Sequence, residues 1–303
     1  MKLFSMQTSI RLIAIGMLST AVLFSCKKEN KQDTAAITEN DATMYSADAM
    51  ETDASYDDIQ DLSMTAAEEE GAESARSGDA GRDPIRVYVF AQLRLRIGNN
   101  ATVTVAPLDG SFPKTVTIDF GASGSVGLDG KFRKGKIVLH YTAPIRESGA
   151  VLTVTLVDYK VGRLSIEGTK VITNLSTGGN IKYSVQVTDG RVTFPSGRGY
   201  AYQKMKYVTQ TAGSTTTQLS DDVFEIEGSS QTNFNNGVVV KLNTQTALVK
   251  KLACPWISAG TLNINVNNFS LALDYAYPSN GDCDNKALLS WNAGASTRII
   301  VLP

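Results

Sequence analysis

AVLTVTLVDYK, residues Ala150–Lys160, alternates aliphatic and polar side chains over most of its length. RLSIEGTKVIT, residues Arg163–Thr173, follows after a short connection and shows a similar alternation. Successive side chains of a β-strand point to opposite faces, so a period of two predicts strands with one buried face. The short connection predicts that these two strands pair antiparallel.

The same periodicity continues in both directions, from Ile85 to the C-terminus. We predict one long strand over Ile85–Ile97, because aliphatic residues alternate there with basic and aromatic ones. The further strands that we predict are Ala101–Ala106, Lys114–Asp119, Lys136–Thr142, Asn180–Thr188, Arg191–Phe194, Tyr200–Thr209, Asp222–Glu227, Val238–Asn243, Ala247–Leu252, Thr261–Val266, Ser270–Tyr275, Lys286–Trp291 and Thr297–Leu302.

Dipeptides of Asp or Asn with Gly separate many of these strands and supply residues that tolerate positive φ. They are Asp109-Gly110, Asp129-Gly130, Asp189-Gly190, Asn236-Gly237 and Asn280-Gly281. No stretch after Pro84 shows a 3.6-residue period with helix caps. We therefore predict one all-β domain over residues 84–303, built as a large antiparallel β-sandwich or a curled β-sheet.

Two stretches of the predicted domain are similar to each other. Ile166-Glu167-Gly168-Thr169 and Ile226-Glu227-Gly228-Ser229 each follow a strand that starts with Gly and a basic residue. The two spacings are similar but not equal. We hypothesise that the domain contains two related β-units.

The formal net charge of −1 hides a strong asymmetry along the chain. Lys27–Asp83 contains 16 acidic and 5 basic residues, whereas Pro84–Pro303 contains 14 acidic and 22 basic residues. The acidic segment is rich in Ala, Ser and Thr and poor in large apolar residues. Such a composition buries too little apolar surface to offset the entropy of ordering, so we predict a disordered acidic tether over residues 26–83.

The N-terminus has the pattern of a bacterial lipoprotein signal peptide over residues 1–25. Lys2 and Arg11 precede 13 uncharged residues, Leu12–Phe24, too few for a membrane-spanning helix. Leu23-Phe24-Ser25-Cys26 is similar to a lipobox, which predicts cleavage before Cys26 and acylation of its thiol. Cys26 would thus join the protein to a membrane. The charged residues Lys27–Lys31 are similar to a surface-export signal, so we expect the outer membrane, and its outer face rather than the periplasmic side.

The other two cysteines of the chain are Cys254 and Cys283. An even pair in an exported protein predicts a disulfide bond. Two buried free thiols are the alternative.

Several segments together resemble an uncharacterised family of outer-membrane lipoproteins of Bacteroidota. The segments that carry the resemblance are Phe112–Gly121, Arg133–Ile137, Ile166–Lys170, Asp221–Ile226, Cys254–Ile257 and Gly281–Ala287. The resemblance covers roughly Phe112 to Trp291. It implies no activity, because the family has no established one. The extra cysteine of some relatives near Ala122-Ser123-Gly124 is missing from this chain.

The residues that could carry catalysis or bind a metal are few. His140 is the single histidine and lies in a predicted strand, with no nucleophile or acid placed beside it by the sequence. With Cys26 acylated and the other cysteines paired, no free thiol or cysteine cluster remains for catalysis or for zinc. Glu225 and Glu227 share one strand face, where they cannot flank a substrate from both sides. We therefore expect no enzyme activity, no metal and no cofactor.

Asp282, Asp284 and Asn285 could bind calcium in a loop, but their spacing lacks the glycine and the final glutamate of an EF-hand. We interpret this stretch as a turn held by the neighbouring Cys283 bridge.

Positive charge and aromatic residues occur together in the first part of the predicted domain. Pro84–Val208 contains 17 basic and 7 acidic residues. The residues that we predict to contact a polyanion are Arg94, Arg96, Lys131, Arg133, Lys134, Lys136, Tyr200, Tyr202, Lys204 and Lys206. An anionic glycan or lipopolysaccharide phosphate would fit them. The export signal makes nucleic acid an unexpected partner. Two other interpretations are an ordinary solvated sheet face and an acidic tether that folds back onto the basic half.

The sequence thus predicts a non-enzymatic cell-envelope lipoprotein with a structural or binding role. A lipid or lipopolysaccharide carrier with an apolar β-groove is the first alternative, and a carboxylate-dependent glycan hydrolase is the second. The oligomeric state stays open.

Overall fold

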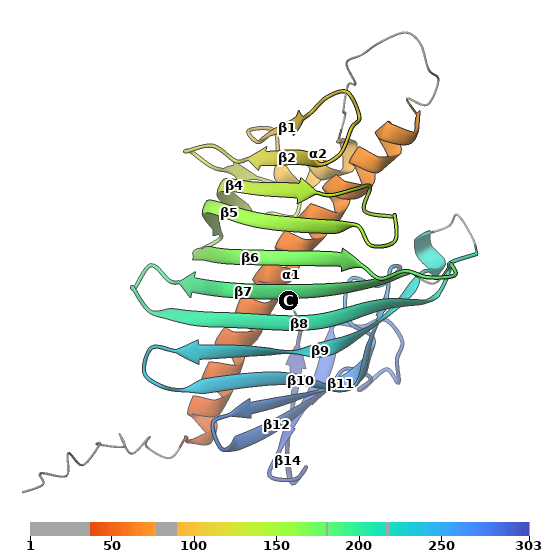
Figure 1. Ribbon diagram of the computed structural model, residues 1–303. Coiled ribbons are helices and arrows are strands. Elements are labelled where there is room, and N and C mark those ends of the chain that lie inside the picture. Colours follow the sequence, from red (N-terminus) through yellow and green to blue (C-terminus); the bar gives the residue numbers. More distant parts are fainter. Residues whose placement is uncertain (1–36, 77–89, 180, 216–218, 303) are drawn as a thin grey trace, which may run out of the picture. The chain divides into compact units, whose positions relative to one another are not determined.

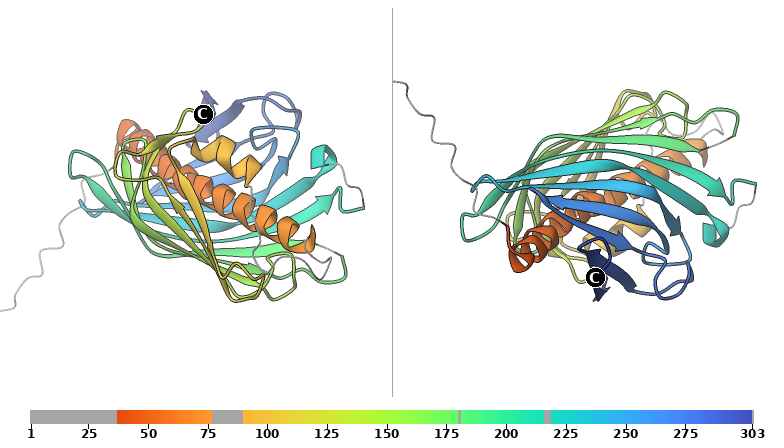
Figure 2. Two further views of the ribbon diagram at one scale, coloured as in Figure 1. Left: turned by 90° about the horizontal axis from the view of Figure 1, so that it is seen from above. Right: turned by 90° about the horizontal axis from the view of Figure 1, so that it is seen from below.

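The computed structural model describes residues 37–76, 90–179, 181–215 and 219–302. In this part of the chain a single antiparallel sheet curls around one long helix, which lies along the concave side of the sheet (Figures 1 and 2). The predicted all-β class is confirmed, and of the two predicted architectures the curled sheet is the one present. None of the described helices is both long and apolar enough to cross a membrane.

The sheet is a meander of 14 strands in the described residues, because each strand pairs with the next one along the chain, except that β3 and β2 both pair with β4. The strands are β1 (Thr102–Ala106), β2 (Lys114–Asp119), β3 (Ser125–Val126), β4 (Phe132–Tyr141), β5 (Val151–Val161), β6 (Leu164–Asn174), β7 (Lys182–Thr193), β8 (Gly199–Ala212), β9 (Val223–Phe234), β10 (Val239–Lys251), β11 (Ala259–Val266), β12 (Phe269–Asp274), β13 (Lys286–Trp291) and β14 (Ser296–Val301). A short 3₁₀ helix, η1 (Leu219–Asp221), precedes β9.

One predicted turn is wrong. Asp189-Gly190 does not separate two strands but lies inside β7, where the pairing with β8 shifts register between Val187 and Gly190. Asp189 has a φ of 53°, so the dipeptide forms a bulge within a continuous strand. The hypothesised two β-units are not tested by this topology and stay a prediction, with the Ile-Glu-Gly stretches lying in β6 and β9 of one meander.

Helix α1 (Glu39–Arg76) is 38 residues long and begins with a capping box. The Thr38 hydroxyl accepts a hydrogen bond from the Asp41 amide at 3.2 Å, and the Asp41 carboxylate accepts one from the Thr38 amide at 3.3 Å. The face toward the sheet repeats with a period of seven, and its buried members include Ala42, Ala49 and Tyr56. Such spacing places these residues on one stripe of the helix.

The prediction of a disordered tether over residues 26–83 is therefore wrong for residues 39–76. That prediction counted the few large apolar residues as too few to pack a helix. In α1, Tyr56, Ile59 and Leu62 are fully buried, and Ala, Ser and Thr side chains and paired carboxylates complete the packing. The boundary at residues 83 and 84 is wrong as well, because α1 belongs to the same compact unit as the sheet, Thr34–Pro303. The remaining tether residues, 26–36 and 77–83, and the signal peptide lie outside the described residues.

The predicted strand over Ile85–Ile97 is also wrong where it is described, because Ala91–Ile97 forms helix α2. Leu93 and Ile97 are buried; their spacing fits a strand face and a helix face equally well. The Glu69 carboxylate of α1 decides between the two, since it accepts hydrogen bonds from the Gln92 and Leu93 amides at 2.7 and 3.0 Å. A carboxylate there satisfies the free amides of a helix start.

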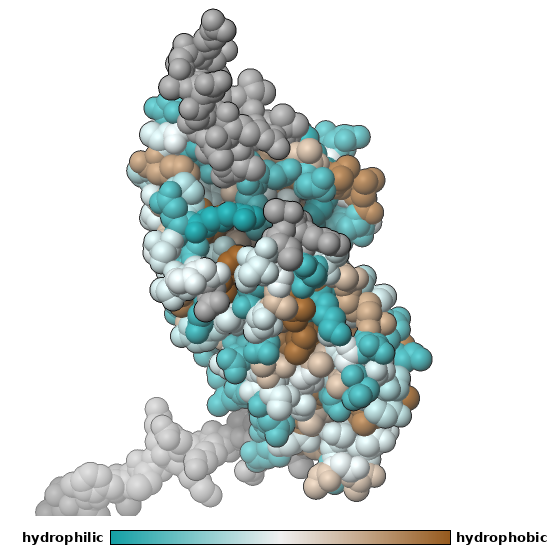
Figure 3. All heavy atoms as spheres, turned by 90° about the vertical axis from the view of Figure 1, so that its right-hand side faces the viewer, coloured by the Kyte–Doolittle hydropathy of each residue, from teal (hydrophilic) through white to brown (hydrophobic). Residues whose placement is uncertain are grey.

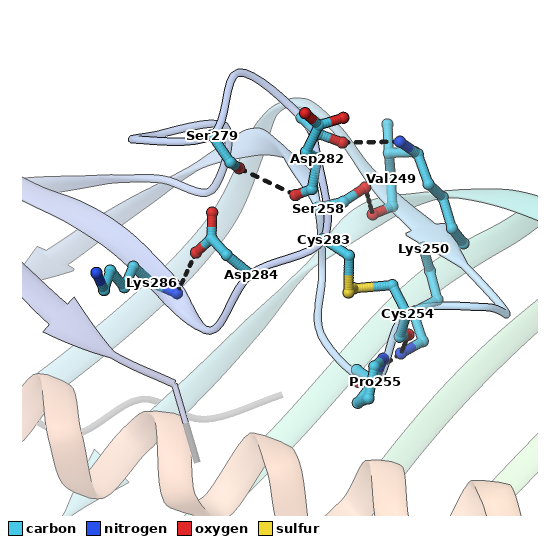
Figure 4. The surroundings of a disulfide bond; sticks show 12 residues. Val249, Lys250, Cys254, Pro255, Ser258, Ser279, Asp282, Cys283, Asp284 and Lys286 are labelled. Carbon is cyan, nitrogen blue, oxygen red and sulfur yellow. Dashed lines mark hydrogen bonds between the residues drawn. A yellow bond between two sulfur atoms is a disulfide. The ribbon is translucent and has the colours of Figure 1, made fainter.

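Cys254 and Cys283 are joined by a disulfide bond, as predicted (Figure 4). It ties the loop after β10 to the loop before β13 across a sequence separation of 29. Closing a loop of that size stabilises a fold by about 3.6 kcal/mol in the chain-entropy description. The Lys250 ammonium group donates to the Cys254 and Pro255 carbonyl oxygens at 2.6 and 2.5 Å, which holds the same loop from the side.

Candidate functional site

The candidate residues of β8 lie on the concave face of the sheet, beneath α1. Tyr200, Tyr202, Lys204 and Lys206 occupy every second position of the strand, so their side chains share one face. All four are buried. The face that they share is the one that α1 covers (Figure 2).

The centre of this interface is a cluster of lysines and helix carboxylates. The Lys204 ammonium group lies 2.7 Å from Asp53 and 3.0 Å from Asp57, and the Lys206 ammonium group lies 2.8 Å from Asp57. The Tyr202 hydroxyl donates to Asp53 at 2.5 Å. Residues four apart on a helix are neighbours on its surface, so Asp53 and Asp57 face the lysines together.

A second cluster surrounds Arg133 of β4, whose side chain is completely buried. Its guanidinium group binds both carboxylate oxygens of Asp58, at 2.8 to 3.1 Å, and also reaches Asp129 at 2.6 Å. Lys131 lies 2.9 Å from Asp58, and Arg96 lies 3.9 Å from it. Fork-shaped pairs of this kind combine charge with fixed geometry.

Further pairs continue toward the two ends of α1. Near its N-terminal end, Asp48 accepts a hydrogen bond from the Tyr200 hydroxyl at 2.8 Å and pairs with Arg198 at 2.9 Å. Near its C-terminal end, Glu70 forms a fully buried ion pair with Lys114 of β2. The helix is thus held to strands that lie far apart in the sheet.

Burial and charge act in opposite directions on these groups. Burial alone raises the pKa of Asp57, but the positive charges of Lys204, Lys206 and Lys170 outweigh it and hold that pKa below its ordinary value. Burial lowers the pKa of Lys204, but Asp53 and Asp57 outweigh it and hold that pKa above its ordinary value. For Lys206 and Lys170 the effect of burial is larger than that of the neighbouring carboxylates, so both pKa values are lowered. The pKa of Lys170 falls to about 7.

Two glycines make room for an aromatic side chain of α1. The Tyr56 ring stacks on the Tyr202 ring at 4.5 Å, and its hydroxyl donates to the Glu167 carbonyl oxygen at 2.6 Å. A Cβ at Gly190 would lie 2.8 Å from that hydroxyl, and a Cβ at Gly168 would lie 2.8 Å from the Gly190 Cα. Only glycine therefore fits where β6 and β7 receive Tyr56.

Most of the predicted polyanion-binding residues contact the chain's own carboxylates. Those that contact acidic side chains of α1 are Arg96, Lys131, Arg133, Tyr200, Tyr202, Lys204 and Lys206. Lys134 and Lys136 lie on the outer face of β4, where Lys136 pairs with Asp119 at 2.8 Å. Arg94 lies in α2. The interpretation in which the acidic segment folds back onto the basic half is the arrangement found for residues 39–76.

The other residues considered for chemistry lie apart from this interface. His140 is on the outer face of β4, with its Nδ1 atom 3.3 Å from the Thr115 hydroxyl. Glu225 and Glu227 are exposed neighbours on one face of β9. Within the described ranges, no three His, Cys, Asp or Glu side chains are grouped so that they could hold a metal ion.

Asp284 accepts a hydrogen bond from the Lys286 amide at 2.5 Å, which fits the interpretation of this stretch as a turn beside the disulfide bond (Figure 4). On the convex face, a depression of about 290 Å³ lies over β7 to β10. Amide side chains such as Gln186, Gln203 and Gln231 line it.

Comparison with protein families, with curated proteins and with solved structures finds no match for this chain.

The buried Arg133–Asp58 pair gives a stability test. Replacing Arg133 with Met leaves Asp58 with the more exposed Lys131 and Arg96, so we expect Arg133→Met to lower the free energy of unfolding by about 3–5 kcal/mol. Urea denaturation followed by circular dichroism measures it. The control is Arg163→Met, which breaks an exposed pair with Glu51 of 2.8 Å and should cost less than about 1 kcal/mol. Equal losses in the two variants would contradict the buried role.

The lowered pKa of Lys170 gives a pH test. In the folded state the pKa of the Lys170 ammonium group is about 7, against its ordinary value of 10.5, so the unfolded state binds more protons between these values. This group therefore makes the folded state gain stability as the pH rises from 7 toward 10.5. We expect Lys170→Met to flatten that rise. The free energy of unfolding of the variant should exceed that of the wild type most at pH 7 and below. Parallel plots of unfolding free energy against pH for the two proteins would contradict the assignment.

Proposed function

We propose that the protein is a non-enzymatic lipoprotein of the cell envelope with a structural or binding role, anchored by acylation of Cys26. The lipobox-like stretch Leu23–Cys26 supports the anchor. Because α1 begins at Glu39, the segment between the anchor and the folded unit is much shorter than the predicted tether of residues 26–83. From Cys26 to Glu39 it reaches at most about 45 Å when fully extended. The folded unit is thus held close to the bilayer instead of on a long tether.

The binding surface that we propose is on the outer face of the sheet, at a group of three lysines. We call Lys134, Lys136 and Lys160 the outer lysine cluster. Lys134 and Lys160 are direct partners across β4 and β5, and like charges in that position repel each other. Within the part of the chain that the structure describes, neither forms an ion pair. A phosphate group between them would remove the repulsion, and this observation carries the proposal.

The inward-facing candidates are not part of this surface. Lys204, Lys206 and Arg133 already have carboxylate partners on α1, whereas Lys134 and Lys136 of the predicted residues lie on the outer face. Lys160, which was not among the residues predicted from the sequence, joins them there as the partner of Lys134. An anionic glycan and the phosphates of lipopolysaccharide are the partners of matching chemistry.

The two alternative functions have weaker support. A carrier would need an open apolar groove, but α1 fills the concave face, and on the side shown in Figure 3 hydrophobic residues form small separate areas among hydrophilic ones. A hydrolase would need two carboxylates facing each other across a cleft, whereas Glu225 and Glu227 are neighbours on one exposed strand face.

The anchor is tested by metabolic labelling with a palmitate analogue in cells that express the full chain. We expect label in the wild type and none in Cys26→Ala, which should also move from the membrane fraction to the soluble fraction. Protease treatment of intact cells then separates the cell surface from the periplasmic side. Recovery of an unlabelled wild-type protein that still carries residues 1–25 would contradict the anchor.

The outer lysine cluster is tested with purified lipopolysaccharide and a chain that starts at Lys27 and keeps the whole unit Thr34–Pro303. We expect Lys134→Ala/Lys160→Ala to weaken binding at low salt by about tenfold, and high salt to weaken wild-type binding similarly. Lys182→Ala/Lys241→Ala, at two exposed lysines elsewhere, is the control. Lipopolysaccharide binding that changes neither with salt nor with Lys134→Ala/Lys160→Ala would contradict the proposal.

A further inference from the structure

Four large apolar side chains are exposed together beside the outer lysine cluster. Leu128 is 83% exposed, Val126 57%, Leu95 49% and Phe132 39%. We call these four residues the apolar tip. Single exposed leucines are common on protein surfaces, but several exposed apolar residues in neighbouring positions, bordered by charge, point to an interaction site.

Hydrogen bonds and strand pairing bring the four residues together. Val126 of β3 is the direct partner of Phe132 of β4, so the two side chains share a face. The Leu128 amide donates to the Leu95 carbonyl oxygen at 2.9 Å, which joins the hairpin to α2. A Cβ at Gly127 would lie 1.9 Å from the Arg96 carbonyl oxygen, so the two backbones are in close contact there.

The tip is held in place from below by the Arg133 cluster. Asp129, in the loop between Val126 and Phe132, accepts from the Arg133 guanidinium group at 2.6 Å and from the Lys131 amide at 3.0 Å. The loop that exposes Leu128 is therefore fixed to the buried Arg133 side chain.

Positive charge borders the tip on its sheet side. Lys134 follows Phe132 by two residues on the same outer face, and Lys160 lies opposite Lys134. The half-exposed Lys131 lies between the tip and Asp58. An apolar surface bordered by lysines complements a bilayer with anionic headgroups, because the apolar groups enter the interface while the ammonium groups meet the phosphates.

We propose that the apolar tip docks into the interfacial region of an anionic bilayer, with the outer lysine cluster at the phosphate level. This inference rests on the anion-binding role proposed above for those lysines. Four side chains are too few for a stable protein interface, which needs roughly 20 to 30 residues on each side. A bilayer needs no complementary shape.

Vesicle co-sedimentation tests this with the unacylated chain from Lys27, using vesicles of phosphatidylcholine alone and of phosphatidylcholine with phosphatidylglycerol. We expect binding to the anionic vesicles and about tenfold weaker binding for Val126→Asp/Leu128→Asp. The matched control is Val301→Asp, which places the same charge at an apolar side chain that is 68% exposed on the last strand. Its binding should equal that of the wild type.

A positive readout complements the loss of binding. Fluorescence of Leu128→Trp should shift to shorter wavelength when anionic vesicles are added, and that of Val301→Trp should not. Equal vesicle binding by Val126→Asp/Leu128→Asp and the wild type would overturn the docking proposal, whereas loss of lipopolysaccharide binding in Lys134→Ala/Lys160→Ala would still support the lysine site. The chain could instead self-associate through the tip. If the tip substitutions abolished self-association but left vesicle binding unchanged, the partner of the tip would be a second copy of the chain, and the docking proposal would be overturned.

Discussion

The neutralisation of the sheet's inward-facing lysines and arginine by the carboxylates of α1 is the constraint on which the rest of the structure depends. Arg133, Lys204 and Lys206 point to the concave side. Without Asp53 and Asp57 the two lysines would repel each other, and without Asp58 the guanidinium group of Arg133 would lose its main partner on α1. Removing either set would leave buried, uncompensated charge, which is strongly destabilising. The helix is therefore a part of the core and not an addition to it.

This constraint also divides the basic residues of the chain between two tasks. Those on the concave face hold α1, and those on the convex face of β4 and β5 stay accessible. The overall charge is nearly zero because the helix compensates the sheet, so net charge alone says little about binding. The proposed anion binding depends instead on the local imbalance at Lys134 and Lys160.

The sheet could be predicted from the sequence because alternation and Asp-Gly turns are local signals, and the cysteine pair because the chain offers no other partners once Cys26 is set aside. Helix α1 was missed because much of its buried surface comes from small residues such as Ala42 and Ala49, with few large ones such as Tyr56. Thr38 and Asp41 form a capping box that could have revealed its start. Helix α2 was missed because Leu93 and Ile97 fit both periods. The partners of Lys204 and Arg133 could not be predicted, since pairing across about 75 to 150 residues leaves no local trace.

The meander has a consequence for how the chain reaches its native state. Every strand pairs with a neighbour in sequence, so the sheet can grow hairpin by hairpin with small loop-closure entropy. The contacts of α1 are different, because the bond between Asp53 and Tyr202 spans 149 residues. Asp53 and Asp57 must therefore wait for β8 before they can be neutralised, and the polar surface of α1 keeps it compatible with water during that interval.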